Sequence, residues 1–67
     1  MGDVARVTEI SARSTTGFDD AVKIGIERAG TTLRNVQSAW VKEQQVKVEE
    51  GRITEYQVNL LVTFVLE

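Results

Sequence analysis

The stretch Ile53–Glu67, ITEYQVNLLVTFVLE, decides the fold, because apolar and polar side chains alternate along most of it. A period of two is typical of a β-strand that buries one face. The odd-numbered positions are mainly polar, although Ile53, Leu61 and Val65 lie among them. We therefore expect a long strand whose even-numbered face packs against the core. That face comprises Tyr56, Val58, Leu60, Val62, Phe64 and Leu66.

The preceding residues predict the partner strand of a hairpin. Glu49–Arg52 contains a glycine and reads as a tight turn, in which glycine accepts a positive φ at little cost. Val36–Val48 alternates before it, but the apolar parity changes along this segment. A β-bulge near Glu43–Gln45 would explain the change, because one extra residue moves every later side chain to the other face. With this bulge, the apolar pair Ala39 and Val41 and the apolar pair Val46 and Val48 would lie on the same face, although their parities differ.

The N-terminal half predicts a strand followed by a helix. Val4–Ile10 is rich in Val, Thr and Ile, and the polar segment Ser11–Gly17 has the composition of a loop. Thr16 and Asp19 resemble a capping box with the shorter acid, which places a helix start here. Asn35 is a plausible helix stop.

The expected helix carries one apolar stripe, which should cover the sheet. Gly25 and Ala29 lie four residues apart on this stripe, and their small size would let the helix lie close to the strands. The glycine costs about 1 kcal/mol of helix propensity. The stripe is formed by Phe18, Ala21, Val22, Gly25, Ile26, Ala29 and Leu33.

The elements predict an α+β fold of order strand, helix, strand, strand, with a three-stranded antiparallel sheet curled around one helix. Residues 1–67 form one domain, because a chain of this length has room for only one core. A domain of about 60 residues hides only about 60% of its unfolded surface. Four apolar side chains also lie on the face that the helix leaves uncovered, which favours a homo-oligomer. They are Trp40, Ile53, Leu61 and Val65.

The composition excludes most classes of enzyme. The chain has no Cys and no His, so it lacks thiolate nucleophiles, imidazole bases and the commonest zinc ligands, and we expect no enzyme. A net charge of -2 argues against nucleic acid as the main partner. Because no apolar run could cross a bilayer and the N-terminus does not resemble a signal peptide, we expect no membrane partner and a cytoplasmic location.

Trp40 and Gln57 are the candidate ligand-binding residues. Their parities place both on the helix-free face of pairing strands, together with Ser38. An indole offers a π-face for a planar heterocycle, and a carboxamide offers a donor and an acceptor for a ring edge. Alternatively, Trp40 anchors a subunit interface and Gln57 is a solvated strand residue. Glu43 and the pair Glu49–Glu50 match no calcium-loop spacing and read better as solvated charges.

Five segments together resemble one known family, the dodecins, over nearly the whole chain. None is diagnostic alone, but their order, spacing and the total length are fairly specific. The segments are RVTEI at 6–10, GFDDAV at 17–22, IERAGTTLRNV at 26–36, EYQV at 55–58 and TFVLE at 63–67.

The resemblance implies a homododecameric hollow cage built of trimers, in which sheets wrap helices. It also implies binding of a flavin, FMN or riboflavin, which is stacked on a tryptophan and hydrogen-bonded by a glutamine for storage or sequestration. Gln57 matches that glutamine. The stacking tryptophan falls on Ser38 in an ungapped alignment, and on Trp40 if the hairpin is two residues shorter. A shift of two residues keeps the face but moves the ring about 6.6 Å along the strand.

Two functions follow. In the first, a dodecin-like cage binds flavin through Trp40, Gln57 and Ser38. In the second, the same cage is free of flavin and has a structural, ion-binding or other small-molecule-binding role, with Trp40 at a subunit junction.

Overall fold

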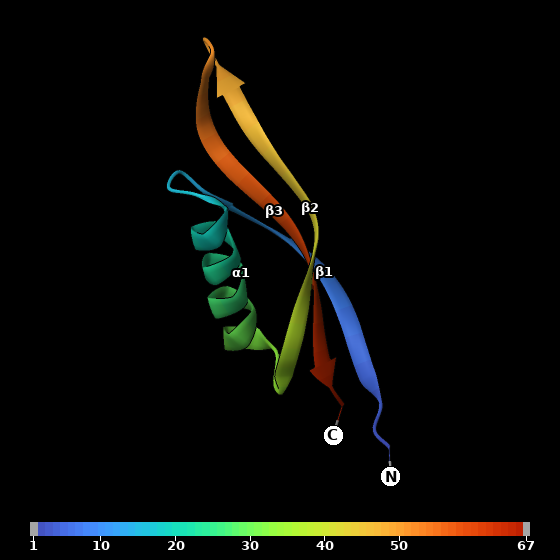
Figure 1. The fold of residues 1–67 in the computed structure, drawn as a ribbon. Coiled ribbons are helices and arrows are strands. Elements are labelled where there is room, and N and C mark those ends of the chain that lie inside the picture. Colours follow the sequence, from blue (N-terminus) through green and yellow to red (C-terminus); the bar gives the residue numbers. More distant parts are fainter. Residues whose placement is uncertain (1, 67) are drawn as a thin grey trace.

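The computed structural model describes residues 2–66 and confirms the predicted order of elements. Strand β1 (Ala5–Ser14) is followed by helix α1 (Phe18–Thr32), and a hairpin of β2 (Val36–Glu49) and β3 (Arg52–Val65) completes the fold. The three strands form one antiparallel sheet in the order β1-β3-β2 (Figure 1). The long strand β3 is therefore central, as its alternating sequence indicates. Met1 and Glu67, at the ends of the predicted domain and last strand, lie outside the described residues.

The core lies between α1 and the even-numbered face of β3. Val58, Leu60 and Val62 are completely buried there. Ala21 and Ala29 from the helix and Ala12 from β1 close the same cluster. The predicted helix stripe is thus confirmed. The predicted face of the last strand is buried at its centre, whereas its last member, Leu66, lies beyond β3 and is 47% exposed.

Gly25 brings the helix close to the sheet. A Cβ atom built on this residue would lie 3.0 Å from Ala12 Cβ and 3.0 Å from Leu60 Cδ1. Such distances are shorter than ordinary van der Waals contact, so a side chain here would displace its neighbours. The expectation that small residues on the stripe permit a close approach is confirmed.

The strand β1 is longer than predicted and the helix begins differently. Ser11–Ser14 is not a loop, because these residues pair with Asn59 through Tyr56 of β3. No side chain caps α1 at its N-cap residue Gly17, so the predicted capping box is wrong. Instead, Ser14 Oγ accepts hydrogen bonds from the backbone N–H of Thr16 and Gly17 and donates one to Asp20.

The helix ends before Asn35, the predicted stop. Its last residue is Thr32, and Leu33 is already extended, with φ -107° and ψ 135°. The extended backbone lets Leu33 pack against the core. Asn35 instead has a φ of 59° in the connection to β2. Asparagine tolerates this left-handed conformation better than most residues.

The hairpin turn is confirmed at Glu50 and Gly51. Glu49 pairs with Arg52, so only two residues connect the strands. Both have positive φ values, 52° and 76°, as the type I′ turn of a two-residue hairpin requires. Glycine adopts this conformation without steric cost.

Irregularities in β2–β3 pairing set the direction of the side chains. The predicted bulge is present one residue earlier than expected, at Lys42 between Val41 and Glu43. It places Val41 and Val46 on the same face, opposite Leu60 and Tyr56 respectively. Two further register shifts occur, between Val36 and Ser38 and between Lys47 and Val48.

The last register shift corrects the prediction for Ile53. Parity alone places Ile53 on the helix-free face, but it pairs with Val48 while Lys47 pairs with Glu55. Thr54 is therefore the extra residue, and its hydroxyl donates to the carbonyl oxygen of Lys47. Since Val48 follows Val46 by two residues on β2, Ile53 lies with them on the helix side of the hairpin.

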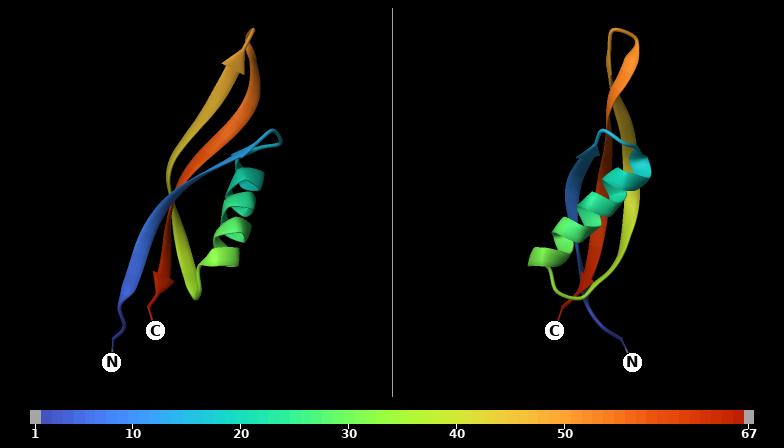
Figure 2. Two further views of the ribbon diagram at one scale, coloured as in Figure 1. Left: turned by 180° about the vertical axis from the view of Figure 1, so that it is seen from behind. Right: turned by 90° about the vertical axis from the view of Figure 1, so that its left-hand side faces the viewer.

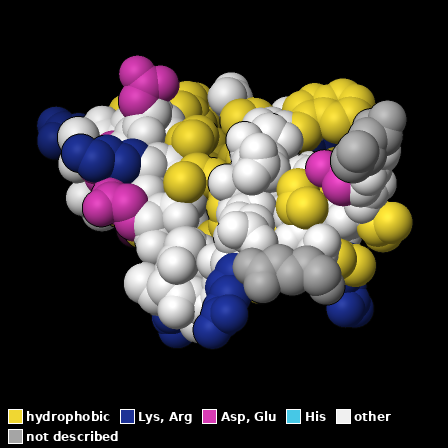
Figure 3. All heavy atoms as spheres, turned by 90° about the horizontal axis from the view of Figure 1, so that it is seen from below, with side chains coloured by type: hydrophobic (Ala, Val, Ile, Leu, Met, Phe, Trp, Pro, Cys, Tyr) yellow, Lys and Arg dark blue, Asp and Glu magenta, His cyan; other side chains and the backbone are white. Residues whose placement is uncertain are grey.

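The molecule is elongated, with extents of 53, 19 and 13 Å. The helix covers only the part of the sheet nearer to the termini, and the β2–β3 hairpin extends beyond it (Figures 1 and 2). Seen from the end where the termini lie, hydrophobic side chains gather in several patches between charged ones (Figure 3). The surface of one copy thus leaves much apolar area in contact with water.

Candidate functional site

Four odd-numbered residues of β3, at positions 57–63, form the middle column of the helix-free face. Each lies between one residue of β1 and one of β2, so that the face is organised in rows of three. We call this surface the helix-free face. Its four rows are Val7-Thr63-Ser38, Glu9-Leu61-Trp40, Ser11-Asn59-Glu43 and Arg13-Gln57-Gln45.

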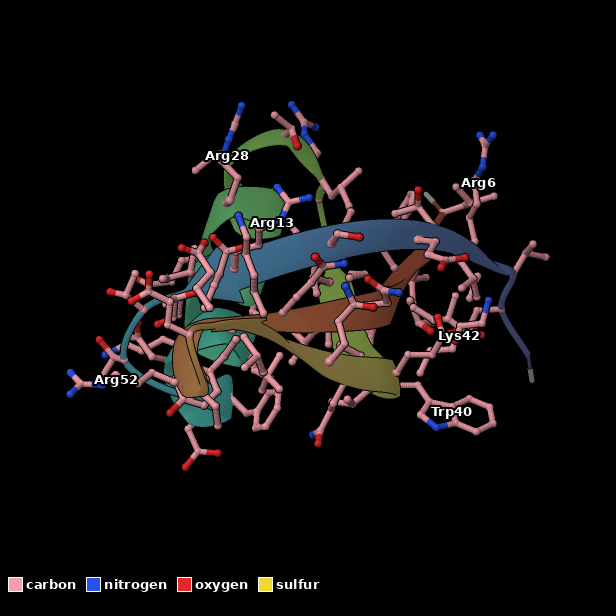
Figure 4. The ribbon with its side chains drawn as sticks, turned by 90° about the horizontal axis from the view of Figure 1, so that it is seen from above. Arg6, Arg13, Arg28, Trp40, Lys42 and Arg52 are labelled. Carbon is pink, nitrogen blue, oxygen red and sulfur yellow. The ribbon has the colours of Figure 1, made fainter. Side chains whose placement is uncertain are left out.

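Trp40 lies on the edge strand β2 in the second row. It is 72% exposed, more than any other large hydrophobic residue of the described chain. Its indole projects away from the ribbon (Figure 4). A nearly uncovered indole has both a large apolar surface and a π-face available for a planar partner.

Gln57 is half-buried in the fourth row and belongs to a polar network. Its Oε1 accepts hydrogen bonds from Arg13 Nε at 3.2 Å and from Gln45 Nε2 at 3.4 Å. Its Nε2 donates to Asn59 Oδ1 at 3.2 Å. The contact with Asn59 uses one of the two N–H groups of the Gln57 amide.

Asn59 joins Gln57 to a carboxylate. Its Nδ2 donates to Glu43 Oε1 at 2.9 Å, and its Oδ1 also accepts from Ser11 Oγ at 2.8 Å. A carboxylate can only accept and a guanidinium can only donate. Because Glu43 stands at one end of the chain of contacts and Arg13 at the other, both amides are fixed in one orientation.

Two charged pairs involve residues of the second and fourth rows of this face. Arg13 Nε lies 3.5 Å from Glu55 Oε1, and Lys42 Nζ lies 3.4 Å from Glu9 Oε1. The four side chains are 35–62% exposed, so each pair contributes about 0–1 kcal/mol to stability. A depression of about 390 Å³ adjoins the first pair. It is lined by Arg13, Gln45, Val46, Lys47, Glu55 and Gln57.

The three predicted site residues lie on the predicted face but not side by side. Trp40 pairs with Leu61 of β3. Leu61 lies four residues from Gln57 on the same strand, which is a separation of about 13 Å. Ser38 pairs with Thr63 and lies one row beyond Trp40. One chain therefore brings Gln57 together with Arg13, Gln45 and Asn59, and leaves Trp40 in a separate row.

The polar partners of Gln57 were not among the predicted site residues. Arg13 was expected in a loop, and Glu43 was considered only as a weak cation ligand. The alternation of β3 places Asn59 two residues from Gln57 on the same face. This spacing was the signal in the sequence that could have identified Asn59 as a partner of Gln57. The contacts of Arg13 and Glu43 depend on the length of β1 and on the bulge at Lys42.

The acidic residues do not form a metal centre within residues 2–66. No group of three or more potential ligands was found among these residues. Glu43 accepts a hydrogen bond from Asn59, and Glu49 lies 3.5 Å from Lys47. No helix of the described chain is long and apolar enough to cross a membrane.

The order of elements and the three-stranded sheet define a class of small strand-helix-strand-strand proteins. The family model described as Dodecin matches residues 4–67. The dodecin of Thermus thermophilus is 37% identical over 67 residues, covering 100% of this chain and 97% of the relative. The chain belongs to the dodecin family.

Solved dodecin structures resemble the whole chain. Dodecin from Streptomyces davaonensis has a TM-score of 0.94 and 36% identity, covering 100% of this chain and 98% of the other. The calcium-chelating immunodominant antigen calcium dodecin from Mycobacterium tuberculosis, described with a novel calcium-binding site, has a TM-score of 0.82. Its identity is 29%, with coverage of 96% and 91%.

Proposed function

We propose that this protein forms a dodecin-like homododecameric cage that binds FMN or riboflavin for storage or sequestration. In this role Trp40 is the stacking platform, Gln57 is the hydrogen-bonding partner of the ring edge, and Ser38 lines the site beside Trp40. The observation that carries the proposal is the 72% exposed indole on the helix-free face of a chain that belongs to the dodecin family.

Self-assembly is supported by the apolar surface that one copy exposes. Among residues 2–66, eight large hydrophobic side chains are more than a third exposed. Exposed apolar surface of this extent usually marks an interface. The proposed cage would cover it. These residues are Val4, Val7, Ile24, Trp40, Val46, Val48, Ile53 and Leu66.

The spacing on the helix-free face suggests how a flavin would be held. Trp40 and Gln57 of one chain are about 13 Å apart along the strands, too far to hold the same small group. A flavin between two copies would instead stack on Trp40 of one copy and accept a hydrogen bond from the second N–H of Gln57 of the partner subunit. The chain has no Cys or His in 67 residues, which favours such a binding role over catalysis.

A flavin-free cage with an ion-binding role is the second candidate. The solved calcium dodecin favours it, as does the hydrogen bonding of the Gln57 amide to three side chains of its own chain. The acids of this chain do not form a ligand cluster within residues 2–66. Calorimetric titration with Ca²⁺ tests this role, and saturable heat in the absence of a flavin response would favour it.

Flavin fluorescence tests the first proposal. Riboflavin or FMN emission should fall on addition of micromolar protein, because a stacked indole quenches the ring. Trp40→Ala should weaken binding by about 1–3 kcal/mol, the usual worth of base-like stacking. That is roughly 5- to 150-fold in Kd. Trp40→Phe is the matched control and should retain part of the affinity.

The test also separates the two candidates. Unchanged emission with the unmodified protein, at a concentration where it is assembled, would contradict flavin binding. If Trp40→Ala instead altered only the assembled mass or its melting temperature, Trp40 would be an interface anchor.

A further inference from the structure

The side-chain amide of Gln57 has different contacts at its oxygen and at its nitrogen. Its Oε1 accepts from Arg13 Nε at 3.2 Å and from Gln45 Nε2 at 3.4 Å. An amide oxygen has two lone pairs, and an amide nitrogen has two N–H groups. The contacts at Oε1 account for both lone pairs, whereas the contact of Nε2 with Asn59 accounts for one N–H group. The acceptor end of Gln57 is therefore saturated within its own chain.

Two residues of this network have a fixed hydrogen-bonding character. A guanidinium can only donate, so Arg13 requires the oxygen of Gln57. An ionised carboxylate can only accept, so Glu43 requires the nitrogen of Asn59, which lies at 2.9 Å. Asn59 then turns its Oδ1 toward Nε2 of Gln57. Both ends of the network therefore impose the same direction on the Gln57 amide, and either end is sufficient to impose it.

The other neighbours do not impose a direction. Gln45 is itself an amide, so its oxygen and nitrogen exchange places when the side chain turns. The hydroxyl of Ser11 donates to Asn59 Oδ1 at 2.8 Å, but a hydroxyl can also accept. Arg13 and Glu43 thus decide the direction, from strands on either side of β3. The ion pair of Arg13 with Glu55 is made through the same Nε and keeps the guanidinium beside Gln57.

We infer that Arg13 and Glu43 are positioning residues that fix the Gln57 amide, so that it offers a ligand an N–H donor and no acceptor. The inference rests on the proposed function for the identity of the ligand. The pyrimidine edge of a flavin carries two carbonyl oxygens, which accept hydrogen bonds, and the N3–H group, which donates one. The site therefore selects a ring carbonyl and makes no use of N3–H.

Riboflavin and N3-methylriboflavin test this selectivity in fluorescence titrations, because the methyl group removes the N3–H donor and keeps both carbonyls. The double variant Arg13→Gln with Glu43→Gln releases both ends of the network. The Gln57 amide can then turn, and Oε1 can accept from N3–H. The preference for riboflavin over its methyl derivative should become about 2- to 12-fold greater than in the unmodified protein, the usual worth of one hydrogen bond. Each single variant should keep the preference of the unmodified protein.

Comparing this preference between variants separates hydrogen bonding from steric effects, because a clash with the methyl group would affect every variant alike. The matched control is the double variant Glu27→Gln with Arg28→Gln, which makes the same charge changes at exposed positions of α1. It should leave the preference unchanged. An equal rise in this control would contradict the roles of Arg13 and Glu43.

Urea denaturation tests the positioning without any flavin. Arg13→Gln, Glu43→Gln and the double variant are compared with the unmodified protein at one protein concentration. Because either end holds the network in its direction, each single variant should lose little stability. The double variant should lose more than the sum of the two single losses, as expected for residues of one network. Additive losses would overturn the inference.

The flavin proposal and this inference can fail separately. Unchanged emission of both flavins with the unmodified protein would contradict flavin binding, and the urea comparison would then decide the roles of Arg13 and Glu43 by itself. A riboflavin preference that is the same in the unmodified protein and in their double variant would leave the flavin proposal standing and overturn the inference.

Discussion

The helix-covered face and the helix-free face of the sheet are built from the same three strands, but they are completed in different ways. On the covered face, Val58, Leu60 and Val62 are fully buried by α1. On the free face, Gln57 and Asn59 form hydrogen bonds with neighbouring side chains, whereas Trp40 is left exposed. The chain therefore buries the covered face by itself, whereas its indole stays exposed in a single copy.

The largest effect should come from removing the centre of the covered face. Leu60→Ala should lower the free energy of unfolding by about 2–5 kcal/mol, because a buried leucine leaves a cavity. Leu61→Ala is the matched control, since the next residue is of the same type but faces away from the helix. Urea denaturation at a fixed protein concentration compares them. Equal losses would contradict the difference between the faces.

Filling the close contact at Gly25 should have the next largest effect. Gly25→Val should destabilise the protein by about 1–3 kcal/mol, because the added side chain meets Ala12 and Leu60. Gly30→Ala is the control within the same helix, where a Cβ meets nothing within 4 Å. It should raise stability by up to about 1 kcal/mol through helix propensity. Thermal melting would distinguish the two, and a neutral Gly25→Val would show that the helix can shift.

The smallest effect is expected on the polar network of the free face. Asn59→Ala removes the link between Gln57 and Glu43 and should cost about 0.5–1.5 kcal/mol of stability. It should also weaken flavin binding, because the Gln57 amide is no longer held in one orientation. Thr54→Ala, a change in a single long hydrogen bond at the hairpin, is the control. Unchanged flavin affinity for Asn59→Ala would show that this orientation is not used.

Local patterns identified the order of the elements and the centre of the covered face. Alternation over 53–67 identified the central strand, the glycine before Arg52 located the turn, and the parity change predicted a bulge at the correct place to within one residue. The strand, the turn and the bulge each depend on residues that are close together in the chain. A local sequence pattern is therefore enough to predict them.

Features that depend on pairing between distant residues were missed. Ser11–Ser14 has a polar composition, and only its pairing with β3 makes it a strand. The side on which Ile53 lies depends on the extra residue Thr54. The separation of Trp40 from Gln57 depends on the register of β2 against β3, which parity alone does not define. The candidate face could thus be predicted, but not the arrangement of its rows.

Sedimentation velocity of the unmodified protein with added FMN tests the central claim most directly, because it follows the protein and the flavin absorption band together. The account predicts one boundary at twelve times the 7.5 kDa chain mass, with flavin absorbance moving in it. A boundary at the mass of one chain, at high and at low protein concentration alike, with all flavin left behind, would contradict it.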